Sequence, residues 1–263
     1  MNSFIIFFKK EIIELIKTVK GIVLAAVFIM TAISSPLIAK LTPEILKLAG
    51  IDGSAEEFQA LMAMIPEPSS LESYTQFFSN FSMMGFLAFI IIFAGIVANE
   101  KSKTTAAYIL TKNISRTQFI ASKFAAAVVF TAVAVFITAA TQIFYTNILF
   151  SDNLVNNADA VIYFAVLLVY LLFILSIVLF ASIVSKNVTT ATFTGFLIFI
   201  GFNIIAAIPR IGKYLPPEIN NLGFMIIMQT KTVSDLTINL IITVICSAIF
   251  IFAGIKLFNR QEL

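Results

Sequence analysis

The stretch Ala160–Val184, AVIYFAVLLVYLLFILSIVLFASIV, decides the class of this protein, because it contains no charged side chain. The hydrocarbon core of a bilayer is about 30 Å thick and a helix rises about 1.5 Å per residue, so about 20 apolar residues cross it. Five other stretches have the same character. We therefore predict six transmembrane helices, at Gly21–Ala39, Phe77–Ala98, Phe124–Thr146, Ala160–Val184, Thr190–Ile208 and Leu236–Ile255.

The composition predicts an all-α integral membrane protein with little soluble mass. Hydrophobic residues make up 60% of the 263 residues and the mean hydropathy is +1.02, whereas soluble domains are about 45–50% apolar. A charge at the centre of a span costs about 2.5–3.5 kcal/mol, so six uncharged stretches are not expected by chance. We divide the chain into an N-terminal amphipathic segment, residues 1–20, and a six-span domain, residues 21–263.

Residue types that carry catalysis or bind metals are scarce. The sequence has no histidine and one cysteine, Cys246, inside the last predicted span. It also lacks a phosphate-binding loop and the residue pairs of nucleophilic hydrolases. Asp235 is the nearest candidate for an intramembrane acid, but its place at the edge of a span predicts a helix cap. We therefore expect no catalytic residue, no metal site and no directly bound cofactor.

The distribution of Lys and Arg predicts the orientation. Six spans put both termini on one side, and twelve of the 17 basic residues fall on that side. The positive-inside rule then predicts a multi-pass protein of the cell membrane with both termini in the cytoplasm. The net charge of +3 arises from this asymmetry, so it does not indicate a nucleic-acid partner.

The N-terminal segment has the pattern of an amphipathic helix. Phe4, Phe8, Ile12 and Leu15 recur at helical spacing, while charged residues such as Lys17 fall on the other face. This one-sided stripe favours a helix that lies in the cytoplasmic membrane interface. The alternative is a continuous extension of the first span.

Several local signals lie on the side opposite the termini. Ser54–Glu57 and Ser69–Glu72 both fit capping boxes, which mark helix starts. Pro216, Pro217 and Glu218 suit the first turn of another helix. The apolar segment Phe224–Met228 that follows is too short to span, so it either dips partway into the membrane or packs on the surface of the bundle.

The polar residues inside the predicted spans are neutral. Gln142, Thr194 and Asn203 are candidates for the lining of a translocation path, but such residues more often bond neighbouring helices.

The connection between the second and third spans, residues 99–119, carries the most specific pattern. Glu100–Leu110 suits a short helix, and Ser115 is expected to cap a helix that continues through Lys123 into the third span. This segment resembles the permease subunit of ABC-2 type transporters, although Lys103 replaces the Gly that commonly precedes the Thr in that family. The matching positions are Glu100, Thr104, Leu110, Ile114, Ser115, Arg116 and Lys123.

The resemblance implies a specific function for this connection. It would form a coupling helix that docks on a separate ATPase subunit, with the functional residues Glu100, Lys103, Thr104, Tyr108, Leu110, Ser115 and Arg116. ATP would bind to that partner, and a second permease subunit, identical or related, would complete an exporter in the lipid bilayer. Two alternatives need no ATPase: a secondary carrier or channel, and a non-transporting assembly or immunity component.

Overall fold

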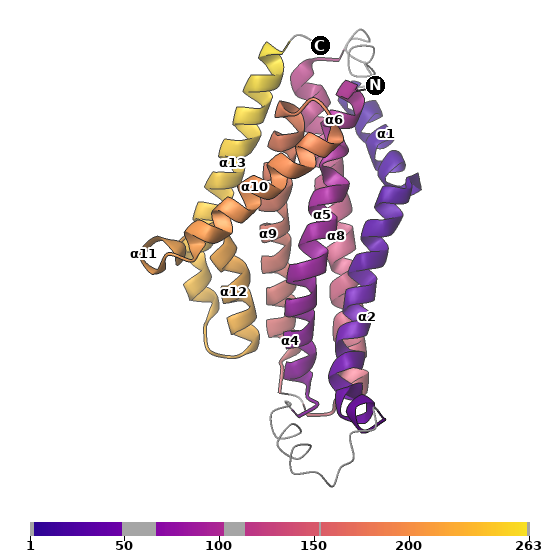
Figure 1. Cartoon of the computed structure of the whole chain (residues 1–263), viewed down its shortest axis with the longest axis vertical. Coiled ribbons are helices and arrows are strands. Elements are labelled where there is room, and N and C mark those ends of the chain that lie inside the picture. The colour runs from indigo at the N-terminus through magenta and orange to yellow at the C-terminus, as the bar shows by residue number, and fades with distance from the viewer. Residues whose placement is uncertain (1–2, 49–66, 103–113, 153, 262–263) are drawn as a thin grey trace.

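A computed structural model describes residues 3–48, 67–102, 114–152 and 154–261. Throughout these residues the regular structure is helical, without a strand, and the beginning of α1 and the end of α13 lie at the same end of the molecule (Figure 1). The elements are α1 (Ser3–Lys17), α2 (Val19–Leu48), α4 (Ser70–Asn80), the π-helical turn η1 (Phe81–Gly85), α5 (Phe86–Phe93), α6 (Gly95–Ser102), α8 (Arg116–Leu149), α9 (Asn157–Val184), α10 (Val188–Ala206), α11 (Pro209–Gly212), α12 (Pro216–Ile227), the 3-10 turn η2 (Val233–Leu236) and α13 (Thr237–Arg260).

The expected all-α membrane architecture is confirmed. Helical segments long and apolar enough to cross a membrane overlap all the predicted spans. Their ends differ from the predicted ones because capping residues, rather than hydropathy, decide where a helix begins. These segments are Val19–Ile45, Ser70–Ser102, Arg116–Leu149, Asn157–Val184, Val188–Ala206 and Val233–Arg260.

Two of the predicted helix starts are confirmed. The Ser69 side chain accepts a hydrogen bond from the Glu72 amide at the start of α4. Ser115 forms a reciprocal capping box with Gln118 at the start of α8. The predicted box at Ser54–Glu57 lies outside the described residues.

Helix α9 forms the centre of the bundle. It packs against α8, α10, α12 and α13, and most of its residues are buried. A helix that is apolar on every side is expected to be enclosed by others, which explains why Ala160–Val184 has the most uniformly apolar sequence. On α10, the buried residues are Ala191 and Gly195, whose small side chains let that helix approach α9.

The second span is interrupted twice. The π-helical turn η1 separates α4 from α5, and the helix breaks again at Ala94. The Ser182 hydroxyl of α9 accepts hydrogen bonds from the amides of Val97 and Ala98 and donates one to the Ala94 carbonyl at 2.7 Å. This side chain thus replaces part of the hydrogen bonding lost at the break.

The N-terminal segment is a separate helix and not an extension of the first span. α1 ends at Lys17 and α2 begins at Val19. Gly21 permits the turn, because a Cβ atom at this position would lie 1.7 Å from the Leu15 carbonyl oxygen. The helix packs against α8 through a face that includes the buried Glu11. The apolar stripe in the sequence did not predict that Glu11 would be buried.

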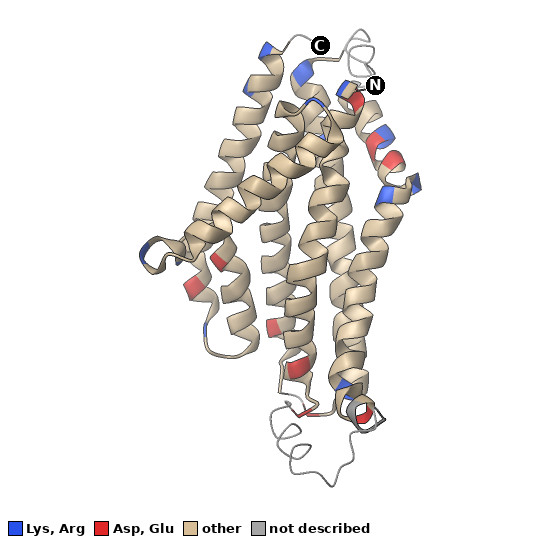
Figure 2. Cartoon of the chain, in the orientation of Figure 1, with Lys and Arg blue, Asp and Glu red and all other residues tan. Residues whose placement is uncertain are grey.

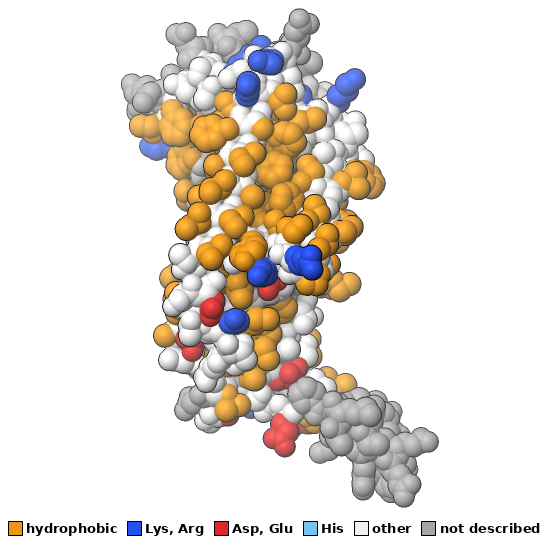
Figure 3. Space-filling model, turned by 90° about the vertical axis from the view of Figure 1, so that its left-hand side faces the viewer, with side chains coloured by type: hydrophobic (Ala, Val, Ile, Leu, Met, Phe, Trp, Pro, Cys, Tyr) orange, Lys and Arg blue, Asp and Glu red, His pale blue; other side chains and the backbone are white. Residues whose placement is uncertain are grey.

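The connection between the last two spans, α10 and α13, contains further helices. α10 ends at Ala206, and α11 lies about half-way along the bundle, carrying basic side chains (Figures 1 and 2). α12 begins at Pro216, as predicted, and packs against α9 and α13 with Ile219 and Ile226 buried. Figure 3 shows that the face formed by α10 and α13 is mostly apolar and is interrupted by Lys and Arg at mid-length. Insertion of α12 into a membrane stays a prediction.

Candidate functional site

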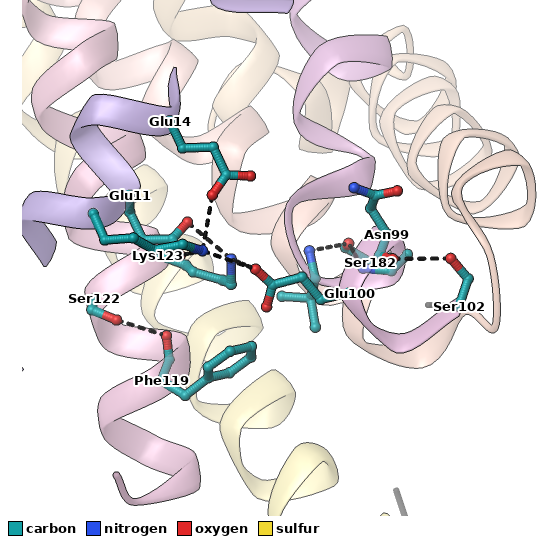
Figure 4. Close-up of polar contacts among 12 residues, drawn as sticks. Glu11, Glu14, Asn99, Glu100, Ser102, Phe119, Ser122, Lys123 and Ser182 are labelled. Atoms are coloured by element: carbon teal, nitrogen blue, oxygen red, sulfur yellow. Dashed lines mark hydrogen bonds and ion pairs between the residues drawn. The ribbon is translucent and has the colours of Figure 1, made fainter. Parts of the chain in front are cut away.

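An ion network joins three helices (Figure 4) at the end of the bundle where α1 begins and α13 ends (Figure 1). The Lys123 ammonium of α8 lies 2.8 Å from Oε1 of Glu100 and 2.9 Å from Oε2 of Glu11. Lys10 extends the network to both carboxylates, at 2.9 Å from Glu11 and 3.3 Å from Glu100, and bonds Glu14 at 2.8 Å. The network therefore connects α1, the last turn of α6 and the second turn of α8.

The centre of this network is shielded from solvent. Lys123 is only 3% exposed, and Glu11 and Glu100 are also buried. The Lys123 ammonium lies 5.2 Å from the centroid of the Phe119 ring, and Lys10 lies over Phe7 in the same way. Such rings attract cations while excluding water, so the ion pairs lie in a medium of lower dielectric than bulk water.

The network also shifts the pKa values of its partly exposed members. Burial would lower the pKa of the Lys10 ammonium, but its hydrogen bonds to Glu14 and Glu11 outweigh burial and raise that pKa. Burial would raise the pKa of the Glu14 carboxyl, but the hydrogen bond and charge of Lys10 lower it. Both groups are therefore held in their charged forms.

The three carboxylates also have the spacing of a cation site. One oxygen each from Glu11, Glu14 and Glu100 lies within 4.8 Å of the others, and carboxylates suit hard cations such as Mg²⁺. Lys10 and Lys123 already bind these oxygens, so a metal ion would have to displace an ammonium group. The arrangement fits a structural ion network better than a metal centre.

Lys101 and Arg116 flank residues 103–113 and hold two helix ends. The Lys101 ammonium donates hydrogen bonds to the carbonyls of Ile183 at 2.6 Å and Ser185 at 3.0 Å, at the end of α9. The Arg116 guanidinium donates to the carbonyls of Phe258, at 3.0 Å, and Gln261, at the end of α13. The carbonyls at a helix C-terminus lack intrahelical partners and carry partial negative charge, so cations stabilise them.

The Gln261 side chain connects these two contacts. Its Oε1 atom accepts a hydrogen bond from Lys101 at 3.0 Å, and its amide donates to the Ile183 carbonyl at 3.1 Å. Lys101, Arg116 and Gln261 thus form a polar clamp that joins α6, α8, α9 and α13. We refer to these three residues as the terminal clamp.

The structure places three of the predicted coupling residues at this end. Glu100 belongs to the ion network, Arg116 to the terminal clamp and Ser115 to the cap of α8. Glu100 is in the last turn of α6, so it ends the second span instead of opening a new helix. The other predicted residues, Lys103, Thr104, Tyr108 and Leu110, lie outside the described residues.

Sequence reasoning missed the residues that complete these contacts. These residues are Glu11, Lys10 and Gln261, and their contacts with α6, α8 and α9 join positions far apart in the chain; Lys123 and Glu11 are separated by 112 positions. One signal was available. Arg116 and Lys123 are seven residues apart, which puts them on the same face of a helix.

The residues proposed to line a path have different environments. Gln142 is fully buried between α8 and α4, and its amide donates a hydrogen bond to Ser73 Oγ at 3.0 Å. Thr194 is half-buried on α10. Asn203 lines a cavity between α5, α9, α10 and α12. Their part in a path stays a prediction.

Comparison with known proteins places the chain in a family without a known activity. It is 23% identical over 257 residues to the uncharacterized transmembrane protein YxlG of Bacillus subtilis (strain 168), covering 97% of this chain and 96% of that protein. A family model described as "Protein of unknown function (DUF2705)" matches residues 54–263. These residues include five of the six membrane-crossing segments and the terminal clamp. The chain therefore belongs to the DUF2705 family of proteins of unknown function.

Proposed function

We propose that this chain is the membrane-spanning permease subunit of an ATP-driven ABC transporter, an exporter, with ATP bound by a separate subunit. The proposal starts from the resemblance of residues 99–119 to the coupling segment of ABC-2 type permeases. It gains support from one structural observation. Both ends of residues 103–113 are fastened to the bundle by buried or partly buried ionic and polar contacts.

The contacts define a route for mechanical force. At one end, Glu100 binds Lys123 and through it α1, while Lys101 binds the end of α9. At the other end, Arg116 binds the end of α13. A partner that pushed on residues 103–113 would therefore act on α1, α6, α8, α9 and α13 together.

The path of this force leads toward the middle of the bundle. α6 ends and α8 begins at the clamped end, and on the way from this end to the middle of the bundle the second span contains a break at Ala94 and then the π-helical turn η1. Interruptions of this kind allow a helix to bend locally. Closure of two ATPase subunits would then change the relation of α4 and α5 to α9 and open a path in a dimer.

The deciding experiment is reconstitution with an ABC ATPase encoded next to this chain's gene. Purification through a tag on this chain should retain the ATPase, and the complex should show vanadate-sensitive ATP hydrolysis. Leu110→Asp and Tyr108→Asp should abolish complex formation while leaving membrane insertion intact. Arg116→Gln should leave the complex intact but lower stimulation of hydrolysis by substrate.

Other outcomes would favour the two alternatives. Gradient-driven transport by this chain alone in liposomes would indicate a secondary carrier or channel. Absence of both transport and ATPase binding, with normal membrane insertion, would indicate a non-transporting component. If both Tyr108→Asp and Leu110→Asp still form the complex with the ATPase, the coupling-helix assignment is wrong.

A further inference from the structure

A cavity of about 450 Å³ lies between the second span, α9, the end of α10 and the start of α12. Figure 1 shows this junction about half-way along the bundle. Ligand cavities of about 300–1,000 Å³ hold small organic molecules. The described residues that line it are Phe78, Ser82, Phe86, Tyr170, Phe199, Asn203, Ala206, Ala207, Pro217, Glu218, Asn220 and Asn221.

The buried side chain of Asn220 offers this cavity a hydrogen-bond acceptor. Asn220 is only 4% exposed, and its Oδ1 atom has no hydrogen-bond partner among the described residues. The Asn203 amide nitrogen, by contrast, donates to the Phe199 carbonyl at 2.8 Å. A buried acceptor without a donor is costly and rare, so a ligand that carries donors would satisfy Asn220.

The charge of the lining points to a cation. Glu218 is the one charged side chain among the lining residues named above. Its carboxylate accepts a hydrogen bond from the neutral Asn221 amide at 3.1 Å and forms no ion pair with a described residue; Lys213 and Lys231 lie with it in the neighbouring pocket, outside this cavity. Within this cavity, therefore, an ammonium group gains a charge partner in Glu218 and a hydrogen-bond acceptor in Asn220.

Aromatic rings form much of the remaining wall. Phe86 and Tyr170 meet edge to face with ring centroids 5.2 Å apart, and Phe86 also contacts Phe199. Ring faces attract cations, and the same rings provide apolar contact for a hydrocarbon or aromatic body. The π-helical turn η1 contributes Ser82, and such turns are frequent at functional sites.

We propose that this cavity binds a small organic cation in which an ammonium group is attached to an apolar or aromatic body. Glu218 and Asn220 receive the ammonium group, and Phe86 and Tyr170 contact the body. The assignment of this ligand class as the transported substrate rests on the proposed function above, whereas binding itself does not require an ATPase.

The test uses dansylcadaverine, a fluorescent primary ammonium compound, with the full chain purified in detergent micelles. N-pentyl dansylamide, which has the same aromatic body without the ammonium group, is the matched neutral probe. Saturable binding of dansylcadaverine is expected, with weak or no saturable binding of the neutral probe. Glu218→Gln should weaken dansylcadaverine binding by about tenfold, and Glu72→Gln, which removes an acid outside this cavity, should not.

Asn220→Leu separates a ligand-binding role from a structural one. Removing an unpartnered buried acceptor should leave the melting temperature unchanged or raise it, yet weaken dansylcadaverine binding by roughly fivefold. Loss of stability with unchanged binding would assign Asn220 to packing. Equal binding of both probes, or equal binding by wild type and Glu218→Gln, would overturn the proposal.

The two proposals fail in different ways. If the ATPase complex forms and hydrolyses ATP but dansylcadaverine does not bind, the permease assignment stands and the ligand class is wrong. If dansylcadaverine binds as predicted but no ATPase associates, the cavity stands as a cation site in a protein that is not an ABC permease.

Discussion

Lys123 and Glu100 form a buried ion pair, with 2.8 Å between Nζ and Oε1, that joins the beginning of the third span to the end of the second. Glu11 of α1 binds the same ammonium group, so one lysine fixes the relation of three helices. Because residues 103–113 lie between Glu100 and Lys123, this pair also fixes the ends of the segment on which the proposed function depends.

Removal of the shared ammonium group should destabilise the bundle. Lys123→Met leaves Glu11 and Glu100 with Lys10 alone, and an uncompensated buried charge costs about 3–5 kcal/mol. The apparent melting temperature in detergent should fall by several degrees, whereas Lys186→Met, at an exposed lysine, should change it little. Adding Glu100→Gln to Lys123→Met should recover part of the loss. Equal melting temperatures of Lys123→Met and Lys186→Met would show that the network does not stabilise the bundle.

The terminal clamp should control the local stability of the end of α13. Arg116→Gln removes the cation that binds the carbonyls of Phe258 and Gln261, so amide hydrogen exchange should accelerate in residues 255–261. Arg116→Lys should restore only part of the protection, because a lysine cannot present a planar fork to several carbonyls. Lys256→Gln, at an exposed residue of the same helix, serves as the control. Unaltered exchange in the Arg116 variants would mean that the clamp is energetically neutral.

Gly21 should be required for the turn between α1 and α2. Gly21→Ala would place a Cβ atom 1.7 Å from the Leu15 carbonyl oxygen, and overpacking of this kind costs about 1–3 kcal/mol. Gly201 provides the matched control, since a Cβ atom there meets nothing within 4 Å, and alanine is favoured over glycine in a helix by about 1 kcal/mol. Thermal unfolding should therefore show opposite effects of the two substitutions. A neutral Gly21→Ala variant would show that the turn can relax.

Asp152 should make the start of α4 sensitive to acid. Its Oδ2 atom accepts a hydrogen bond from the Ser70 amide at 2.7 Å. Burial would raise its pKa, but the hydrogen bonds from Ser70 and Leu154 outweigh this and lower it. A carboxyl whose pKa is lowered by folding stabilises the protein above its ordinary pKa, near pH 4, and loses this effect as the pH falls further.

The corresponding variant is Asp152→Ala. It should cost about 1 kcal/mol at neutral pH, and in unfolding measurements its difference from wild type should shrink progressively as the pH falls below about 4. Glu67→Ala, at an exposed residue, should show no such pH-dependent difference. A difference between Asp152→Ala and wild type that persists at low pH would exclude the charge as its source.

Substitutions of Gln142 and Asn203 should have different effects, because we expect Gln142 to stabilise the bundle and Asn203 to contact the ligand. Gln142→Leu removes the hydrogen bond to Ser73, and such interhelical bonds average about 0.6 kcal/mol. It should lower the melting temperature slightly and leave dansylcadaverine binding unchanged. Asn203→Leu, at the cavity wall, should weaken that binding. Loss of dansylcadaverine binding in Gln142→Leu would instead indicate that Gln142 lines the translocation path.

The local features of the fold could be predicted from the sequence. Ala160–Val184 became the central helix because a segment without a charge has no polar face to present to water. Ser69 and Ser115 were correctly predicted as helix starts, since a cap depends on residues within one turn of each other. Hydropathy and capping act over short distances along the chain, so the sequence determined the number, type and approximate ends of the spans.

Tertiary structure decided which polar groups meet. The sequence pattern made no prediction for Glu11, yet it is buried against Lys123, which lies 112 positions away. The cavity beside Asn220 depends on α10 ending half-way along the bundle and on α12 packing against α9. Such contacts depend on the angles and offsets at which helices pack, and these angles arise from the fit of many side chains together rather than from any local pattern.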